Sequence, residues 1–159
     1  MVMLVSAFAI PSLSSAMRGM QLAADSRNIA SALIYAKLSA TSQMKRYRVS
    51  LVLAENRWQV EKFNSASGLF EAEQEGNTLT TESGIAFKTT SSTALTGYPS
   101  ASSTAITFNS RGIPVDDAGT PTTNNVVYIS KADSDIAISV SLAGKVQVWK
   151  YSSSQWRSQ

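Results

Sequence analysis

The first seventeen residues of the chain carry no charge, and the first ten are almost wholly apolar. As a helix this segment reaches about 25 Å, less than the hydrocarbon core of about 30 Å in a typical bilayer. It also lacks the basic start of a secretory signal peptide. Two interpretations stay open: a core helix with an apolar end, or the continuation of a hydrophobic helix that begins before Met1. Pro11 is expected to kink this helix without necessarily ending it.

From residue 20 onward the apolar positions recur at steps of about three and four, the spacing of one helical face. No proline or glycine interrupts residues 20–46. The pattern predicts one long helix over about residues 2–46, apolar all round at its start and amphipathic afterwards. The predicted buried face is formed by Leu22, Ser26, Ile29, Leu33, Ala36, Ala40 and Met44. The residues predicted to lie off this face are Asp25, Arg27, Asn28, Ser31 and Lys37.

After residue 46 the pattern changes to the alternation of half-buried β-strands. Residues 47–63 predict a hairpin, and a closing hairpin turns at Ala143-Gly144, where glycine tolerates a positive φ. The further predicted strands are 85–88, 105–108, 126–129, 136–142 and 145–149. The predicted loops are 64–77, 89–103 and 114–125. The Ser/Thr-rich loop 89–103 is expected to be mobile and too polar to pack.

These elements predict an α+β fold in which the long N-terminal helix packs on an antiparallel sheet of about six or seven short strands. The expected organisation is a helix over 1–46, with an apolar segment 1–20 and an amphipathic part 21–46, followed by a β-rich head over 47–159. There is no internal repeat.

The composition narrows the function more than the fold. The chain has 159 residues, with 26 Ser and 13 Thr but no His and no Cys. Without histidine there is no Ser-His-Asp triad and no His-ligated zinc, and without cysteine there is no thiolate nucleophile, disulfide or iron–sulfur cluster. The net charge of +3 is too mild to imply nucleic acid by itself. A polar but weakly charged, Ser/Thr-rich chain is typical of an extracytoplasmic β-rich protein.

The remaining reactive residues give no specific signal for catalysis or metal binding. Ser–Lys pairs arise by chance among 26 Ser and 7 Lys, and there is no Gly-x-Gly phosphate loop. The carboxylate pairs and runs lie in predicted loops without a predicted cleft. Calcium needs about six to eight oxygen ligands, and Asp133 and Asp135 supply two carboxylates. We therefore predict no enzyme activity, no cofactor, no metal site and no small-molecule substrate. The other carboxylate groups in predicted loops are Glu71, Glu73 and Glu75, and Asp116 and Asp117.

Five segments follow one another in the order and spacing of a known family. They are 7–13, 31–37, 48–58, 106–112 and 136–146. In these segments the chain resembles the GspH/FimT-type minor pseudopilins, which belong to the type IV pilin-like superfamily. The matches are a helix-kink segment, the family's Ala-Arg position at the end of the helix core (Ala36-Lys37 here), a first hairpin with a tryptophan, an Asn-Ser-x-Gly turn and a closing hairpin.

The resemblance also shows what this sequence lacks. The family's leader peptide, its processing site with an aromatic first mature residue, and its glutamate at the fifth mature position have no counterpart here. If Pro11 is the proline of the helix kink, about eleven residues of mature helix are missing before Met1, through truncation or a shortened reading frame. Arg18 and Arg27 follow the apolar run, so the positive-inside rule alone favours the opposite orientation. In the family the basic leader outweighs such residues.

The resemblance implies a structural subunit of a type II secretion pseudopilus or a type IV pilus. Its expected location is the inner membrane, as a single-pass protein with the head in the periplasm, and its expected partners are other pilin or pseudopilin subunits. The assembly helix implied in this way is formed by Val2, Leu4, Val5, Phe8, Ile10, Pro11, Leu13, Met17 and Met20.

The alternative function is a pilus-associated DNA receptor for natural transformation, because some members of the family have that role. Their binding relies on basic residues in the last hairpin and the C-terminal tail. Here Lys145 replaces an expected arginine and Gln147 replaces another, so the phosphate-binding signature is diluted. A solvated hairpin edge with aromatic anchors against the sheet remains the other interpretation. The candidate DNA-binding residues are Lys145, Lys150, Trp156 and Arg157.

Overall fold

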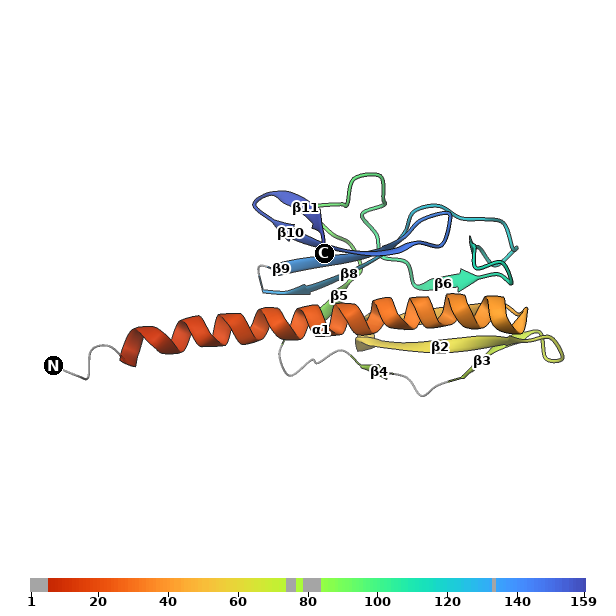
Figure 1. Ribbon diagram of the computed structural model, residues 1–159, viewed down its shortest axis with the longest axis horizontal. Helices are drawn as coiled ribbons and strands as arrows, with labels where there is room; N and C mark the ends of the chain where they lie inside the picture. The colour runs from red at the N-terminus through yellow and green to blue at the C-terminus, as the bar shows by residue number, and fades with distance from the viewer. Residues whose placement is uncertain (1–5, 74–76, 79–83, 133) are drawn as a thin grey trace.

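One long helix lies against two antiparallel β-sheets and extends beyond them at its N-terminal end (Figure 1). The structure is a computed structural model that describes residues 6–73, 77–78, 84–132 and 134–159, with side chains from residue 19 onward except at 77–78. Helix α1 spans Ser6–Gln43 and continues through Pro11. It ends before the predicted residue 46 because Met44 adopts a left-handed conformation with φ of 55°. The predicted start at residue 2 lies outside the described residues.

The packing of one long helix on antiparallel strands confirms the predicted α+β class, but the strands form two sheets and not the one sheet that was predicted. The first is six-stranded, in the order β3-β2-β1-β6-β7 with β4 also paired to β2, and the second has the order β11-β10-β9-β8-β5. The strands of the first sheet are β1 (Tyr47–Val52), β2 (Arg57–Asn64), β3 (Leu69–Ala72), β4 (Asn77–Thr78), β6 (Ala105–Phe108) and β7 (Pro114–Val115). Those of the second are β5 (Ala86–Lys88), β8 (Asn125–Lys131), β9 (Ser134–Val140), β10 (Val146–Ser152) and β11 (Gln155–Ser158).

The hydrophobic core lies between α1 and the inward faces of both sheets. The predicted helical face is buried from Leu22 to Ala40, including Ser26, whose hydroxyl donates to the Ala23 carbonyl. The prediction that Met44 belongs to the buried face is wrong. Its side chain is 78% exposed because the helix ends at Gln43. Asp25 was expected off the buried face but is itself buried, since the contact face is wider than the narrow apolar stripe.

The first hairpin shows why alternation predicted the strands well. Tyr47 pairs with Lys62, Val49 with Val60 and Leu51 with Trp58 across β1 and β2. A 3₁₀ turn (η1, Leu53–Glu55) connects these strands in the place of the predicted turn. The inward side chains of β1 are buried and the intervening ones are half-buried, which is the period-two pattern of a sheet with one face on the core.

All seven predicted strands are present, and four short strands that were not predicted join them. Strands β3 and β4 lie in the predicted loop 64–77, β7 lies in the predicted loop 114–125, and β11 follows the last predicted strand. These strands have two to four residues each, too few for a clear alternation in the sequence. They form because a longer neighbouring strand offers hydrogen-bonding partners.

The Ser/Thr-rich segment 89–103 packs on the outer face of the second sheet, so the prediction that it is too polar to pack is wrong. Its one large aliphatic side chain, Leu95, is buried in a small cluster with Val126, Tyr128 and Ala137. The Tyr128 hydroxyl accepts a hydrogen bond from the Leu95 backbone N–H and donates one to the Pro99 carbonyl. One tyrosine thus holds the segment at two points.

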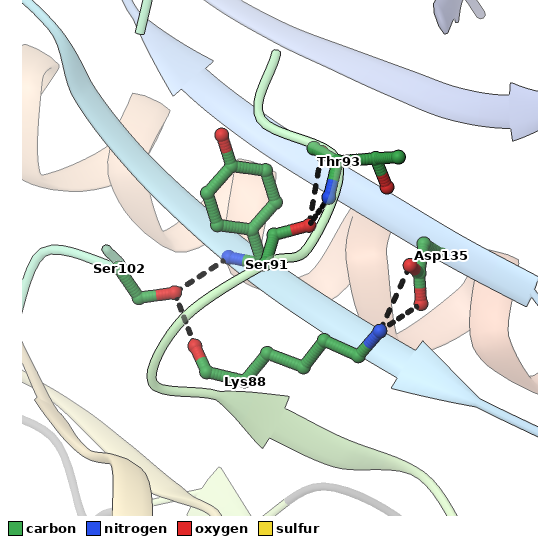
Figure 2. Close-up of polar contacts among 6 residues, drawn as sticks. Lys88, Ser91, Thr93, Ser102 and Asp135 are labelled. Atoms are coloured by element: carbon green, nitrogen blue, oxygen red, sulfur yellow. Dashed lines mark hydrogen bonds and ion pairs between the residues drawn. The ribbon is translucent and has the colours of Figure 1, made fainter. Parts of the chain in front are cut away.

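Polar contacts hold the start and the end of the same segment (Figure 2). Lys88 makes an ion pair with Asp135 at 2.8 Å, and the Ser102 hydroxyl donates to the Lys88 carbonyl while accepting from the Tyr128 N–H. The buried Ser91 hydroxyl bonds only to the backbone of Thr93, forming a local turn. Serine hydroxyls here take the place of backbone hydrogen bonds, within the segment at Ser91 and across to β8 at Ser102, which is how a polar segment can lie flat on a sheet.

The helix and both sheets meet at one junction near the C-terminal end of α1. Lys37 donates from Nζ to the Gly144 carbonyl at 2.8 Å. A Cβ at Gly144 would lie 2.2 Å from the Gly112 carbonyl oxygen, so the β9–β10 turn touches the turn between β6 and β7. Lys37, expected to lie off the buried face, is therefore half-buried because two turns close over it.

Candidate assembly helix and basic hairpin

The N-terminal part of α1 projects beyond the head (Figure 1). Lys131, at the end of β8, donates to the Gln21 side chain at 2.9 Å, which marks where the head begins along the helix. Residues 6–20 lie before this contact and extend about 22 Å at 1.5 Å per residue. In the part of the chain that the structure describes, no helix is long and apolar enough to cross a membrane.

The predicted assembly residues are distributed along this projecting segment. Phe8, Ile10, Pro11, Leu13 and Met17 lie within α1, and the Met20 side chain is 73% exposed. Val2, Leu4 and Val5 lie outside the described residues.

A second apolar surface on α1 was missed from the sequence. Ile34, Tyr35 and Leu38 are exposed on the side of the helix that faces away from the core, and Leu38 is 60% exposed. Ile34 and Leu38 are four residues apart and therefore neighbours on the helix surface. That spacing is visible in the sequence, but the stronger apolar stripe beside it already accounts for the core.

The candidate DNA-binding residues do not form one cluster. Lys150 and Arg157 are directly paired across β10 and β11, so their side chains lie on the same face of the sheet, and both are exposed. Lys145 lies in the turn at the opposite end of β10, next to the Lys37 junction. Trp156 is paired with Tyr151 one position along, so it lies on the opposite face from Lys150.

Trp156 is an aromatic anchor of the head. It is half-buried, packs against the cluster that holds segment 89–103, and has its ring centroid 6.0 Å from Tyr128 and 5.2 Å from Tyr151. Its indole N–H is buried and makes no hydrogen bond with any residue that the structure describes. This placement matches the interpretation in which aromatic side chains anchor the last hairpin to the sheet.

Several of the carboxylates that were candidates for acid–base or metal chemistry make hydrogen bonds or an ion pair within the head. Glu71 accepts hydrogen bonds from Asn64 and Ser67, and Asp135 is paired with Lys88. Within the described ranges, no three His, Cys, Asp or Glu side chains gather to hold a metal ion. Glu75 and Asp133 lie outside these ranges. Asp116 accepts from the Thr120 N–H and stabilises a turn.

Tyr47 is the titratable residue with the most altered environment. Its side chain is fully buried and its hydroxyl donates to Glu73 at 2.9 Å. Burial raises the pKa of this phenol well above its usual range, and the neighbouring Glu73 carboxylate raises it further. Burial likewise raises the pKa of Tyr128. Phenols held neutral in this way stabilise a packed core.

Comparison with known proteins identifies one family model. The model described as type II transport protein GspH matches residues 25–144, a range that includes most of α1 on the head, the first sheet, strands β5, β8 and β9 of the second sheet, and the Lys37 junction. A comparison with curated protein sequences finds no match.

Solved structures share the fold at low sequence identity. The minor pseudopilin EpsH from the type 2 secretion system of Vibrio cholerae superposes with a TM-score of 0.56 at 13% identity, over 80% of this chain and 95% of that chain. The type IV minor pilin FimU of Pseudomonas aeruginosa strain PAO1 superposes with a TM-score of 0.58 at 19% identity, over 86% of this chain and 92% of that chain. A second crystal form of FimU superposes with a TM-score of 0.55 at 20% identity, over 83% of this chain and 94% of that chain.

Proposed function

Because the chain belongs to the GspH family of type II transport proteins, we propose that it is a structural subunit that assembles into a pseudopilus or pilus through α1. The supporting observation is the division of the helix. Residues 22–40 supply the core of the head, whereas residues 6–20 extend about 22 Å past it. The projecting segment is mostly apolar in sequence, and other helices of the same kind offer it a packing partner.

The role of a subunit is also supported by the second apolar surface on α1. Ile34 and Leu38 would lie in contact with a neighbouring subunit if the filament packs its members side by side along their helices. Apolar side chains exposed in neighbouring positions favour such a contact. In this proposal the apolar segment 1–20 anchors the chain in the inner membrane before assembly, and the head lies in the periplasm.

The assembly proposal can be tested by photo-crosslinking of the full chain in cells that express the filament machinery. A photoreactive amino acid is placed at Met20, at Leu38 and, as the control, at the exposed Ser110 on the turn beyond β6. We expect adducts with other pilin-like subunits from Met20 and Leu38, identified by mass spectrometry in sheared filaments. The proposal is wrong if both positions give the same adducts as Ser110, or if the chain is absent from the filament fraction.

A DNA receptor is the second candidate, and it rests on the pairing of Lys150 with Arg157. Two phosphate contacts give a slope of about −1.8 in a plot of log affinity against log salt for duplex DNA. Saturable oligonucleotide binding by the full chain with this slope, lost in the variant K150Q/R157Q, would favour the receptor. Absence of binding at low salt would rule it out.

A further inference from the structure

Two cations face each other at the edge of the second sheet without an anionic partner. Lys150 on β10 and Arg157 on β11 are directly opposite in the strand register, and both side chains are exposed. The ion pairs in the described part of the chain involve other residues, so no described carboxylate neutralises either cation. Like charges directly opposite on a sheet are destabilising. Their placement therefore favours a site that receives a negative group from outside the chain.

The position of this pair along α1 follows from two contacts. Lys131 binds Gln21 at one end of the second sheet, and Lys37 binds the Gly144 carbonyl at the other end. Strand β10 starts next to Gly144 and runs toward the level of Gln21, which places Lys150 and Arg157 at the end of the head from which the helix projects. The β10–β11 hairpin is visible at that end in Figure 1.

We propose that Lys150 and Arg157 bind the anionic headgroups of the bilayer that holds the N-terminal segment of α1. This inference rests on the membrane anchoring in the proposed function. The first charged residue of the sequence is Arg18, so the uncharged part of the helix ends close to the level of the cation pair. A bilayer that contains the segment before Arg18 would bring its headgroups next to Lys150 and Arg157.

Nucleic acid offers the same phosphate chemistry, but the surroundings of the pair favour a membrane. Single-stranded nucleic acid is bound by cations together with aromatic side chains on which the bases stack. The aromatic residues beside the pair in the hairpin, Trp149, Tyr151 and Trp156, lie on the opposite face of the sheet and are half-buried. A headgroup layer requires only exposed cations at the right height.

Vesicle binding of the full chain tests the proposal. The variant K150Q/R157Q removes the pair, and the control R111Q/K145Q removes two exposed cations from the turns at the far end of the head, with the same change in net charge. The affinities are measured by flotation with pure phosphatidylcholine vesicles and with vesicles that also contain phosphatidylglycerol. Each cation near an anionic surface contributes about fivefold, so the first variant should lose about 10- to 25-fold on the anionic vesicles.

We expect K150Q/R157Q to lose affinity only for the anionic vesicles, and this loss should decrease as the salt concentration is raised. The affinity of the control variant should change by less than about twofold. Equal losses in both variants, or no preference of the native chain for anionic vesicles, would overturn the headgroup contact. An oligonucleotide that binds the native chain, where anionic vesicles show no advantage, would overturn it in favour of a DNA site. Failure of the native chain to bind pure phosphatidylcholine would instead contradict the membrane anchoring in the proposed function.

Discussion

The contact between the turns at Gly112 and Gly144 makes a sharp prediction about stability. Gly144 has φ of +70°, and a Cβ there would lie 2.2 Å from the Gly112 carbonyl oxygen. The variant Gly144→Ala therefore meets a conformational cost of about 1–2 kcal/mol for the left-handed backbone and an overlap cost of about 1–3 kcal/mol. A shift of the turn also weakens the hydrogen bond from Lys37 to the Gly144 carbonyl. The expected loss in the free energy of unfolding is about 3–5 kcal/mol.

Gly119→Ala is a matched control for this substitution. Gly119 has φ of +86° and closes a turn through the same kind of backbone hydrogen bond, but a Cβ there meets nothing within 4 Å. Gly119→Ala should lower the free energy of unfolding only by the conformational cost of the left-handed backbone, about 1–2 kcal/mol. Thermal unfolding of the full chain in one nonionic detergent should show a Tm lowered by about 10 °C or more for Gly144→Ala, and by clearly less for Gly119→Ala. Equal shifts in the two variants would refute the close contact between the turns.

Two further predictions concern the buried tyrosines. Because the pKa of Tyr47 is raised in the folded state, unfolding releases a phenol that ionises above about pH 10, and stability should fall as pH rises beyond that value. In urea titrations at increasing pH, Tyr47→Phe should reduce this decrease in the free energy of unfolding. The assignment would be contradicted if neither Tyr47→Phe nor Tyr128→Phe changed the pH dependence of that free energy. Tyr128→Phe leaves the Leu95 N–H and the Pro99 carbonyl without their shared partner, so it should cost about 1–3 kcal/mol and speed proteolytic cleavage within 89–103. Cleavage at the native rate would show that the tyrosine does not hold the segment.

The sequence predicts those parts of the fold in which a local period coincides with the tertiary contact. The helical stripe from Leu22 to Ala40 and the alternation from Tyr47 to Val60 are periodic because the same face meets the core over several turns or residues. The helix end was placed too late because apolar Met44 continues the period beyond the last helical hydrogen bonds. Periodicity carries no information about where the backbone changes conformation.

Contacts between distant residues could not be predicted in this way. Lys37 is a polar residue that becomes half-buried because it binds the carbonyl of Gly144, 107 positions away. Leu95 stands alone among serines and threonines, and only the outer face of the second sheet, with Tyr128 on it, makes it a core residue. The four short strands likewise depend on neighbours that the local sequence does not contain. In the candidate site, the sequence shows that Lys150 and Arg157 are close along the chain. Only the strand register places their side chains on one face of the sheet.

The arrangement of the head on α1 has a consequence for assembly. Both ends of the second sheet are tied to the helix, by Lys131 at Gln21 and by Lys37 at Gly144, and the first sheet shares the same core. The helix is continuous from the projecting segment into the head, so the direction in which residues 6–20 are held also sets the direction of the head. In the proposed membrane-anchored state, the end with Lys150 and Arg157 lies next to the anchor, the turns at Gly112 and Gly144 point away from it, and Ile34 and Leu38 face sideways. In the proposed assembly, this arrangement would present Ile34 and Leu38 to a lateral neighbour without any change in the fold of the subunit.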